Sequence, residues 1–369
     1  MKCGIVGLPN VGKSTLFNCL SSVKAQSANF PFCTIEPNIG MVQVPDKRLN
    51  RLGELVRPQR VVPAVIEIVD IAGLVKGAHK GEGLGNQFLS NIRETQAIIH
   101  VLRCFEDEKI IHIEGYIDPI RDKELIDTEL QLKDLETVEK CLEKSKKQAK
   151  SGSKEDLKVV DLMQKIAQVL SLGKNARTLT LADDEIKIFS ALQLLTAKPE
   201  LYLCNVDEIS LKTGNPHVAA VKKAVVNEQT EVLILAAQTE ADIAELETYE
   251  ERKLFLYDLG LEEPGFHRLI HATYVLLNLQ TYFTIGIKEV RAWTIQKGWT
   301  APEAASVIHT DFQKGFIRAD VIHYEDFIKY GSEHKVREAG KMSVEGKDYI
   351  VQDGDIIHFR FNVSCIKKP

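Results

Sequence analysis

The chain has 369 residues, of which 44% are hydrophobic and 27% charged, and its formal net charge is −5. This length suits two or three domains with separate cores, and the composition excludes the disordered and fibrous classes. A slightly acidic chain has no general attraction for nucleic acid, so such a partner would need a local basic patch.

The N-terminal segment and the cysteines indicate where the protein works. The sequence MKCGIVGLPNVGK lacks the pattern of a signal peptide, and no stretch of 18 apolar residues could span a membrane. The seven cysteines show no CxxC spacing, so we expect reduced, mostly buried thiols and neither a disulfide framework nor a zinc site. The expected location is the cytoplasm, without a membrane partner.

Residues 2–20 have the pattern of a strand, a glycine-rich loop and a helix. The loop sequence GLPNVGKS at 7–14 fits the phosphate-binding motif GxxxxGKS in full. Backbone N–H groups would wrap the phosphates, Lys13 would reach the β- and γ-phosphates, and Ser14 would ligate Mg²⁺. The residues expected to contact the nucleotide here are Asn10, Val11, Gly12, Lys13, Ser14 and Thr15.

Four further apolar runs indicate strands of a parallel sheet covered on both faces. They lie at 64–71, 97–102, 200–204 and 232–235. Asp70 closes the first of these runs and begins the sequence DIAG. About 60 residues after a phosphate loop, such an acid is expected behind the metal ion, and Gly73 could sense the γ-phosphate.

Two loops complete the expected phosphate site. Thr34, in the segment PFCTIEPN, could add its hydroxyl to the magnesium shell, although it could equally be a turn threonine. The segment 73–88 carries glycines at 73, 77, 81, 83 and 85, which favour a mobile switch. The last three do not follow a strand with the spacing of a dinucleotide fingerprint.

Residues 126–170 indicate a helical hairpin. Apolar residues recur at helical spacing on both sides of a turn at Ser151–Gly152–Ser153. Residues 140–158 contain seven lysines and three acidic residues, which gives an excess of four positive charges at the tip. The tip is therefore either a solvated surface or a contact for RNA or a ribosome.

The last part of the chain, from about 278, predicts a strand-rich sheet with one helix across it. Residues 289–295 alternate, Thr300 and Glu303 form a capping box before a helical run, and the turn Asp353–Gly354 precedes the alternating strand IIHFRF.

Taken together, several motifs closely resemble the YchF branch of the Obg-like ATPases. They are GLPNVGKST, NFPFCTIEPN, VDIAGLVKGAHKGEGLGNQFL, LQTYFT and KEVRAWTI, and the resemblance extends from residue 2 to about 363. It implies an α/β fold: a G-domain-like P-loop domain with a mainly parallel sheet, a coiled-coil insertion and a ubiquitin-like (β-grasp) TGS domain. The expected bounds are 1–125 with 198–277, then 126–197, then 278–363, and a tail at 364–369.

The resemblance implies hydrolysis of ATP in preference to GTP, and the base-side residues agree with it. In a guanine-specific NKxD motif the aspartate accepts two hydrogen bonds from guanine, whereas this chain has Asn205, Val206, Asp207 and Glu208. Val206 replaces the lysine and Glu208 displaces the carboxylate, which would remove ~1 to 3 kcal/mol per lost hydrogen bond to a charged group. We expect Asn205, Val206 and Glu208 to contact the nucleotide, with Ala236–Ala237 completing the base-side loop.

Catalysis needs a group other than the glutamine that orients water in Ras-like enzymes, because Leu74 follows DIAG here. The resemblance points to His112, in KIIHIEG, as the group acting on water, with Lys13 as the other catalytic residue. His112 could instead simply pack between Ile111 and Ile113. Asn10 resembles the potassium ligand of related GTPases, so K⁺ is a candidate cofactor beside Mg²⁺.

The sequence thus predicts an ATPase that switches its affinity for the ribosome, through the large subunit or the intact particle, with an rRNA contact at the hairpin tip. A GTP-using translation factor and a nucleotide-gated ribosome adaptor with incidental hydrolysis are the alternatives. A small-molecule kinase would need a phosphoacceptor pocket and lid arginines, for which there is no clear signal.

Overall fold

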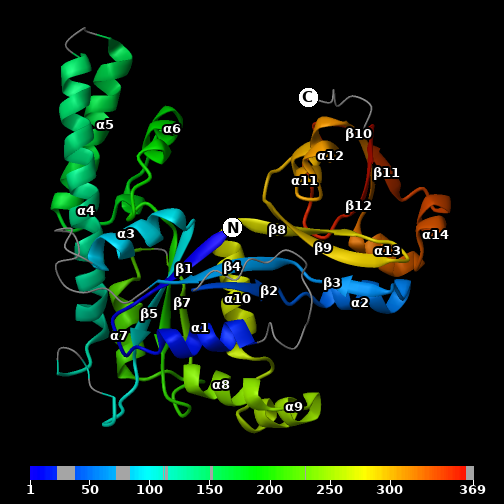
Figure 1. Ribbon diagram of the computed structural model, residues 1–369, viewed down its shortest axis with the longest axis horizontal. Helices are drawn as coiled ribbons and strands as arrows, with labels where there is room; N and C mark the ends of the chain where they lie inside the picture. The colour runs from blue at the N-terminus through cyan, green and yellow to red at the C-terminus, as the bar shows by residue number, and fades with distance from the viewer. Residues whose placement is uncertain are drawn as a thin grey trace. The chain divides into compact units, whose positions relative to one another are not determined.

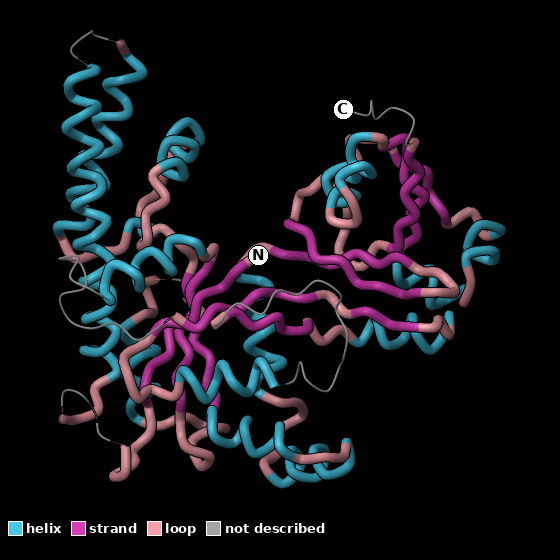
Figure 2. The backbone as a smooth tube through the Cα atoms, viewed as in Figure 1, coloured by secondary structure: helices cyan, strands magenta, loops and turns pink. Residues whose placement is uncertain are grey.

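The computed structural model describes residues 1–22, 38–71, 84–110, 112, 115–149, 153–228 and 230–362 (Figures 1 and 2). The chain divides into two compact units. One contains residues 1–40 and 67–269, and the other contains residues 41–66 and 270–369.

A six-stranded sheet is the centre of the first unit, in the order β2-β4-β1-β5-β6-β7. The pairs from β4 through β7 are all parallel. Every residue of β5 and β6 is buried, which explains why these strands read as continuous apolar runs. The predicted strands are confirmed as β1 Lys2–Val6, β4 Val65–Asp70, β5 Ala97–Arg103, β6 Glu200–Asn205 and β7 Val232–Leu235, whereas the edge strand β2 Ile39–Gln43 was not predicted.

Helices pack on this sheet and on one another. α3 contacts β1, α4 contacts β5 and α7, and α1 packs on α8. Their bounds are α1 Lys13–Ser22, α3 Leu84–Glu94, α4 Pro119–Gln148, α5 Lys154–Ser171, η3 Ala176–Thr178, α6 Asp183–Ala191, α7 Pro216–Ala224, α8 Ala237–Glu245, α9 Tyr249–Asp258 and α10 Gly265–Leu276. In the described part of the chain, no helix is both long and apolar enough to cross a membrane.

The expected helical hairpin is present as α4 and α5, which run side by side in Figure 1. Val138, Leu162 and Ile166 are buried between them. α4 begins earlier than the expected residue 126, because Asp118 caps it by accepting hydrogen bonds from the backbone N–H groups of Ile120 and Arg121. Residues 150–152, where the turn was expected, lie outside the described residues.

The segment expected to be a mobile switch is partly helical. Residues 84–88 belong to the first turns of α3, so the glycine-rich pattern extended the expected loop too far. Residues 72–83 are outside the described part of the chain. Five predicted free thiols are confirmed, all but the last buried: Cys3, Cys19, Cys104, Cys204 and Cys141.

The second unit contains a sheet in the order β11-β10-β12-β8-β9-β3. β8 and β9 form an antiparallel hairpin, and β12 runs parallel to β8. A core that includes Tyr282, Ile295 and Phe359 lies against α11. The bounds are α2 Lys47–Val56, β3 Arg60–Val62, β8 Leu279–Thr284, β9 Glu289–Gln296, α11 Ala301–Ser306, α12 Thr310–Lys314, β10 Phe316–Ile322, α13 Tyr324–Tyr330, α14 Glu333–Glu338, β11 Met342–Glu345 and β12 Ile356–Phe361.

Two features of this unit differ from the expectation. The single expected helix is replaced, in the described residues, by four short helices between β9 and β11. β3 pairs in parallel with β9, and Arg48 forms an ion pair with Asp353 at 2.8 Å. Residues 41–66, expected in the nucleotide-binding domain, therefore pack with the C-terminal sheet. The three-part domain division otherwise remains a proposal.

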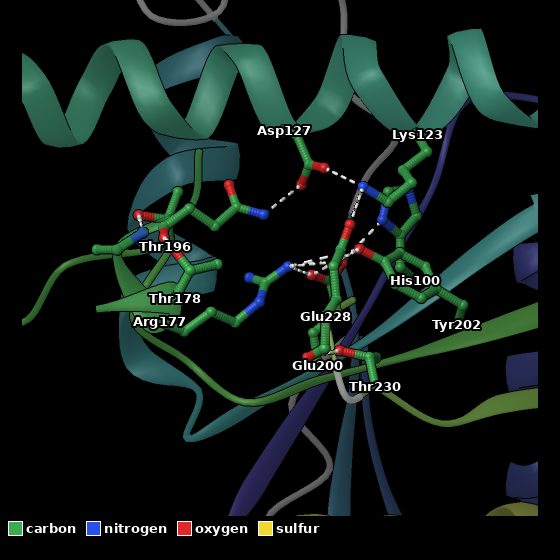
Figure 3. A network of polar contacts seen from close by, with 12 residues as sticks. His100, Lys123, Asp127, Arg177, Thr178, Thr196, Glu200, Tyr202, Glu228 and Thr230 are labelled. Carbon is green, nitrogen blue, oxygen red and sulfur yellow. Dashed lines mark hydrogen bonds and ion pairs between the residues drawn. The ribbon is translucent and has the colours of Figure 1, made fainter. Parts of the chain in front are cut away.

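A buried polar network joins the base of α4 to the sheet of the first unit (Figure 3). Glu200, at the start of β6, lies between His100 of β5, at 2.8 Å, and Arg177 of η3. Burial disfavours the charged form of Glu200, but Arg177 and the hydrogen bond from His100 prevail and hold the pKa of Glu200 below its usual range.

α4 enters the same network through Lys123. Its ammonium group lies 2.8 Å from both Asp127, one turn along α4, and Glu228. Glu228 also accepts a hydrogen bond from Tyr202 at 2.9 Å. Buried charges are tolerated only when each is paired, so this set of contacts fixes where α4 sits on the sheet.

We expect Glu200→Gln to lower the stability of the nucleotide-free protein by about 3 kcal/mol or more, because Arg177 would then lose its buried counter-charge. Urea unfolding monitored by circular dichroism measures the loss. Lys158→Ala is the control, because it removes only an exposed pair with Asp184 and should change little. Equal midpoints for Glu200→Gln and the wild type would contradict a role of the network in stability.

Candidate functional site

The loop between β1 and α1 has the backbone that a phosphate-binding loop needs. Gly12 has φ +94°, a left-handed conformation that favours glycine, and a Cβ there would collide with the side-chain amide of Asn205. Asn10 also adopts a left-handed backbone, with φ 65°. α1 begins directly after Gly12, so its free N–H groups and its dipole point into the loop.

Lys13 and Asp70 are the two charges that the sheet brings to this loop. The β1–β4 register pairs Ile5 with Asp70, which places the acid beside the strand that leads into the loop. Burial lowers the pKa of Lys13 and raises the pKa of Asp70, and each charge partly opposes the shift of the other. Burial therefore opposes the charged form of each group.

The residues present fit a magnesium ion. Asp70 Oδ1 is buried and has no hydrogen-bond partner among the described residues, so it is an oxygen ligand with spare capacity. Ser14, at the start of α1, is exposed and offers a hydroxyl. Carboxylate and hydroxyl oxygens, directly or through water, are the donors that Mg²⁺ prefers. Thr34, the third expected metal ligand, lies outside the described residues.

Asn205 connects the phosphate loop to the base-side loops. Its Nδ2 donates to the carbonyl of Val11 at 2.9 Å, and its Oδ1 accepts from the backbone N–H of Ala237 at 2.9 Å. The side chain is only 5% exposed. Asn205 thus fixes the spacing of three loops, a positioning role that the motif alone did not indicate.

The other base-side residues differ in what they present. Val206 is 3% exposed and packs in the core with Leu102, Cys104 and Leu211, so its side chain faces the interior. A lysine at this position would place its charge in that core, and only the backbone of Val206 is suited to contact a nucleotide. Glu208 is exposed, and Asp207 accepts a hydrogen bond from Ser210 N–H at 2.8 Å.

His112 is buried against the start of α4. Its Nε2 lies 2.9 Å from Asp122 Oδ2, and Arg121 Nη2 lies 3.5 Å from its Nδ1. It therefore has polar partners, while Ile111 and Ile113, the apolar neighbours that the sequence suggested, lie outside the described residues. The catalytic role of His112 stays a prediction. Leu74 also lies outside the described residues.

Arg103, at the end of β5, is a residue that sequence reasoning missed. It is 1% exposed, and its guanidinium donates to the carbonyls of Phe105, Asp107 and Ile110. It therefore organises the loop that leads to His112. Burial lowers the pKa of Arg103, while Asp107 and Asp122 oppose that shift. The sequence did contain one signal for this residue, because Arg103 is a charged residue at the end of an otherwise apolar strand.

Two family models match the chain. The MMR_HSR1 model, described as a 50S ribosome-binding GTPase, matches residues 2–149. The YchF-GTPase_C model, described as a protein of unknown function (DUF933), matches residues 279–362. The first match contains the phosphate loop and α4, and the second contains most of the C-terminal sheet.

Similar proteins cover the whole chain. "Ribosome-binding ATPase YchF" of Haemophilus influenzae is 55% identical, over 98% of this chain and 99% of its own length. The protein of the same name in Bacillus subtilis is 51% identical, over 98% and 100%. The solved structure of the Schizosaccharomyces pombe YchF GTPase has a TM-score of 0.89 and 40% identity, and the match covers 98% of this chain and 97% of that one.

We expect Asp70→Asn to stabilise the protein when nucleotide and Mg²⁺ are withheld. The raised pKa of Asp70 means that its ionised form costs stability as the pH rises through that pKa, and asparagine removes this cost. At neutral pH the melting temperature of the variant should therefore lie above that of the wild type.

The same substitution should weaken binding of Mg²⁺–nucleoside triphosphate at least about tenfold, because the spare carboxylate oxygen is lost. Calorimetry with and without Mg²⁺ separates the metal-dependent part of the affinity. A variant that is less stable and binds as tightly as the wild type would show that Asp70 is structural.

Proposed function

The chain belongs to the YchF family, and on that premise we propose that it is an ATPase that associates with the ribosome and binds MgATP in preference to GTP. The observation that carries the proposal is the pair formed by Lys13 and Asp70 at the phosphate loop. A buried cation at a helix N-terminus suits a polyphosphate, and a buried carboxylate with spare capacity suits the metal that accompanies it.

In this proposal each part of the loop has one task. Lys13 and the backbone of the 10–15 loop hold the phosphates, and Ser14, Thr34 and Asp70 hold Mg²⁺. The metal, when bound, would neutralise charge on the β- and γ-phosphates. Asn10, with its left-handed backbone, is the proposed potassium ligand.

Hydrolysis needs a water in line with the γ-phosphorus. The water oxygen forms a bond to that phosphorus, the bond to the β–γ bridging oxygen breaks, and ADP and phosphate are released. We assign the acceptance of a hydrogen bond from this water to neutral His112, because an aliphatic residue follows DIAG. Arg103 supports the assignment by ordering the loop before His112.

The preference for ATP rests on the base-side loop. The buried side chain of Val206 supplies no cation, and Asp207 is engaged with Ser210. Glu208 occupies the position of the aspartate that selects guanine but is one methylene longer, which moves its carboxylate away from the place where that aspartate accepts two hydrogen bonds. The names GTPase and ATPase both occur among the similar proteins, so a GTP-using translation factor is the second candidate.

The ribosome contact is assigned to the hairpin formed by α4 and α5. Lys146 and Lys147, in the last turn of α4, are exposed, and Lys150 follows them. Lysines at a projecting tip suit the phosphates of rRNA. We infer the large subunit or the intact ribosome as the partner, and hence the cytoplasm as the place of action. An adaptor with incidental hydrolysis would bind the ribosome equally well, but ribosomes would not raise its rate of ATP hydrolysis.

Competition binding tests the nucleotide preference. We expect ATP to bind the wild type at least about tenfold more tightly than GTP, which is ~1.4 kcal/mol. Lys13→Ala is the control for site identity, because it should lose both nucleotides at micromolar concentration. Tighter binding of GTP would favour the translation-factor reading.

Reversal of charge at the tip tests the ribosome contact. Lys146→Glu with Lys147→Glu should weaken binding to purified ribosomes and reduce the slope of log affinity against log salt by about 2, because two phosphate contacts are lost. Lys222→Glu with Lys223→Glu, two exposed lysines of α7, changes the same charge elsewhere. Equal losses for the two double variants would show a general charge effect instead of a contact at the tip.

A further inference from the structure

Three side chains form a polar cluster at the start of α4. His112 Nε2 lies 2.9 Å from Asp122 Oδ2, and Arg121 donates to Asp122 Oδ1 from Nη2 at 3.1 Å and from Nε at 3.3 Å. Arg121 Nη2 also lies 3.5 Å from His112 Nδ1. We call these three residues the α4 latch.

The latch turns both ring nitrogens of His112 toward α4. A carboxylate accepts hydrogen bonds and a guanidinium only donates, so the partners assign the proton to Nε2 and the lone pair to Nδ1. Only 5% of the His112 side chain and 2% of the Asp122 side chain are exposed. In this arrangement each ring nitrogen of His112 lies against a side chain of α4.

We propose that Asp122 is a positioning residue that holds His112 away from the attacking water and so limits the rate of ATP hydrolysis. This inference rests on the proposed function, in which His112 acts on that water. The fraction of molecules with an open latch then sets the rate, since only a released imidazole can accept the hydrogen bond.

The opposite role, in which Asp122 orients His112 for catalysis, requires a different geometry. In catalytic pairs of that kind the carboxylate holds one ring nitrogen while the other points at the reacting group. Here the second nitrogen faces the guanidinium of Arg121. The arrangement therefore withdraws His112.

The loop on the other side of His112 is fixed independently. Arg103 binds the carbonyls of Phe105, Asp107 and Ile110 from within the sheet. Residues 105–110 are thus anchored to β5, whereas the contacts of the latch come from α4. Opening therefore depends on the hydrogen bonds to Asp122 and on the position of the first turns of α4.

Single-turnover hydrolysis with saturating MgATP and K⁺ tests the proposal in the full-length chain. Asp122→Asn should raise the rate about tenfold, because a hydrogen bond to a buried charge is replaced by a weaker neutral one. His112→Ala should lower the wild-type rate at least tenfold. The double variant should match His112→Ala, because the latch acts only through the histidine.

Two matched variants control for charge and shape. Asp118→Asn removes a carboxylate from the same helix start, keeps the cap on α4, and should leave the rate unchanged. Asp122→Glu keeps the carboxylate and should keep the rate near that of the wild type. Hydrogen–deuterium exchange of peptides containing His112 should be faster in Asp122→Asn than in Asp118→Asn. This measurement detects release of His112 from the latch independently of ATP hydrolysis.

The outcomes distinguish a failure of the latch from a failure of the proposed role of His112 in hydrolysis. If His112→Ala is slow and Asp122→Asn is equal to the wild type or slower, the latch is wrong and the proposed function stands. If Asp122→Asn is also faster in the His112→Ala background, its effect does not run through His112 and the latch is again wrong. If His112→Ala matches the wild type, the role of His112 in hydrolysis fails, and the latch with it. Should Asp122→Asn fold poorly, Asp122→Ala is measured in its place with the same expectations.

Discussion

Everything at the phosphate loop depends on keeping one cation, at the start of α1, and one anion, at the end of β4, largely buried beside each other. The parallel register of β1 and β4 brings Asp70 beside the strand that leads to Lys13. Burial shifts the pKa values of both toward the neutral forms. A polyphosphate supplies a counter-charge for Lys13 and its divalent cation supplies one for Asp70, so the cost of burying the two groups is offset when that ligand binds. Asn205 then connects the phosphate loop to the base-side loop through its hydrogen bonds to Val11 and Ala237.

The sequence was most informative where the backbone itself sets the chemistry. Continuous apolar runs identified β1, β4, β5, β6 and β7, but not β2 or β3. The phosphate loop could be placed because glycine spacing reflects backbone conformation. Cap signals were also sufficient, since Asp118 followed by Pro119 indicates the true start of α4, although the apolar spacing from 126 took precedence in the interpretation.

Contacts between distant residues could not be predicted in this way. A linear motif does not show that the side chain of Val206 packs inward. Nor does it show that the side-chain amide of Asn205 hydrogen-bonds to two neighbouring loops. The pairing of His112 with Asp122 depends on how a loop folds back on the next helix. β3 pairs with β9, more than two hundred residues away, and a strand of three residues has too little periodicity to reveal its partner. Thr34 and Leu74 lie outside the described residues, so the expectations for them stand as predictions.

α4 is one uninterrupted helix of 30 residues. At about 1.5 Å per residue it is roughly 45 Å long. Lys123, Asp127 and Asp134 anchor its first half, through Glu228, Asn175 and the backbone N–H groups of residues 195 and 196. The latch lies before these anchors, and the lysine-bearing end lies beyond them. The part of the helix beyond the anchors is therefore several times longer than the part before them. A modest sideways force on the lysine-bearing end of α4 produces a torque at its first turn. There the torque acts on the few hydrogen bonds of the latch. Mechanical advantage, built from helix length and from anchors confined to the first half of the helix, is thus a property of this chain.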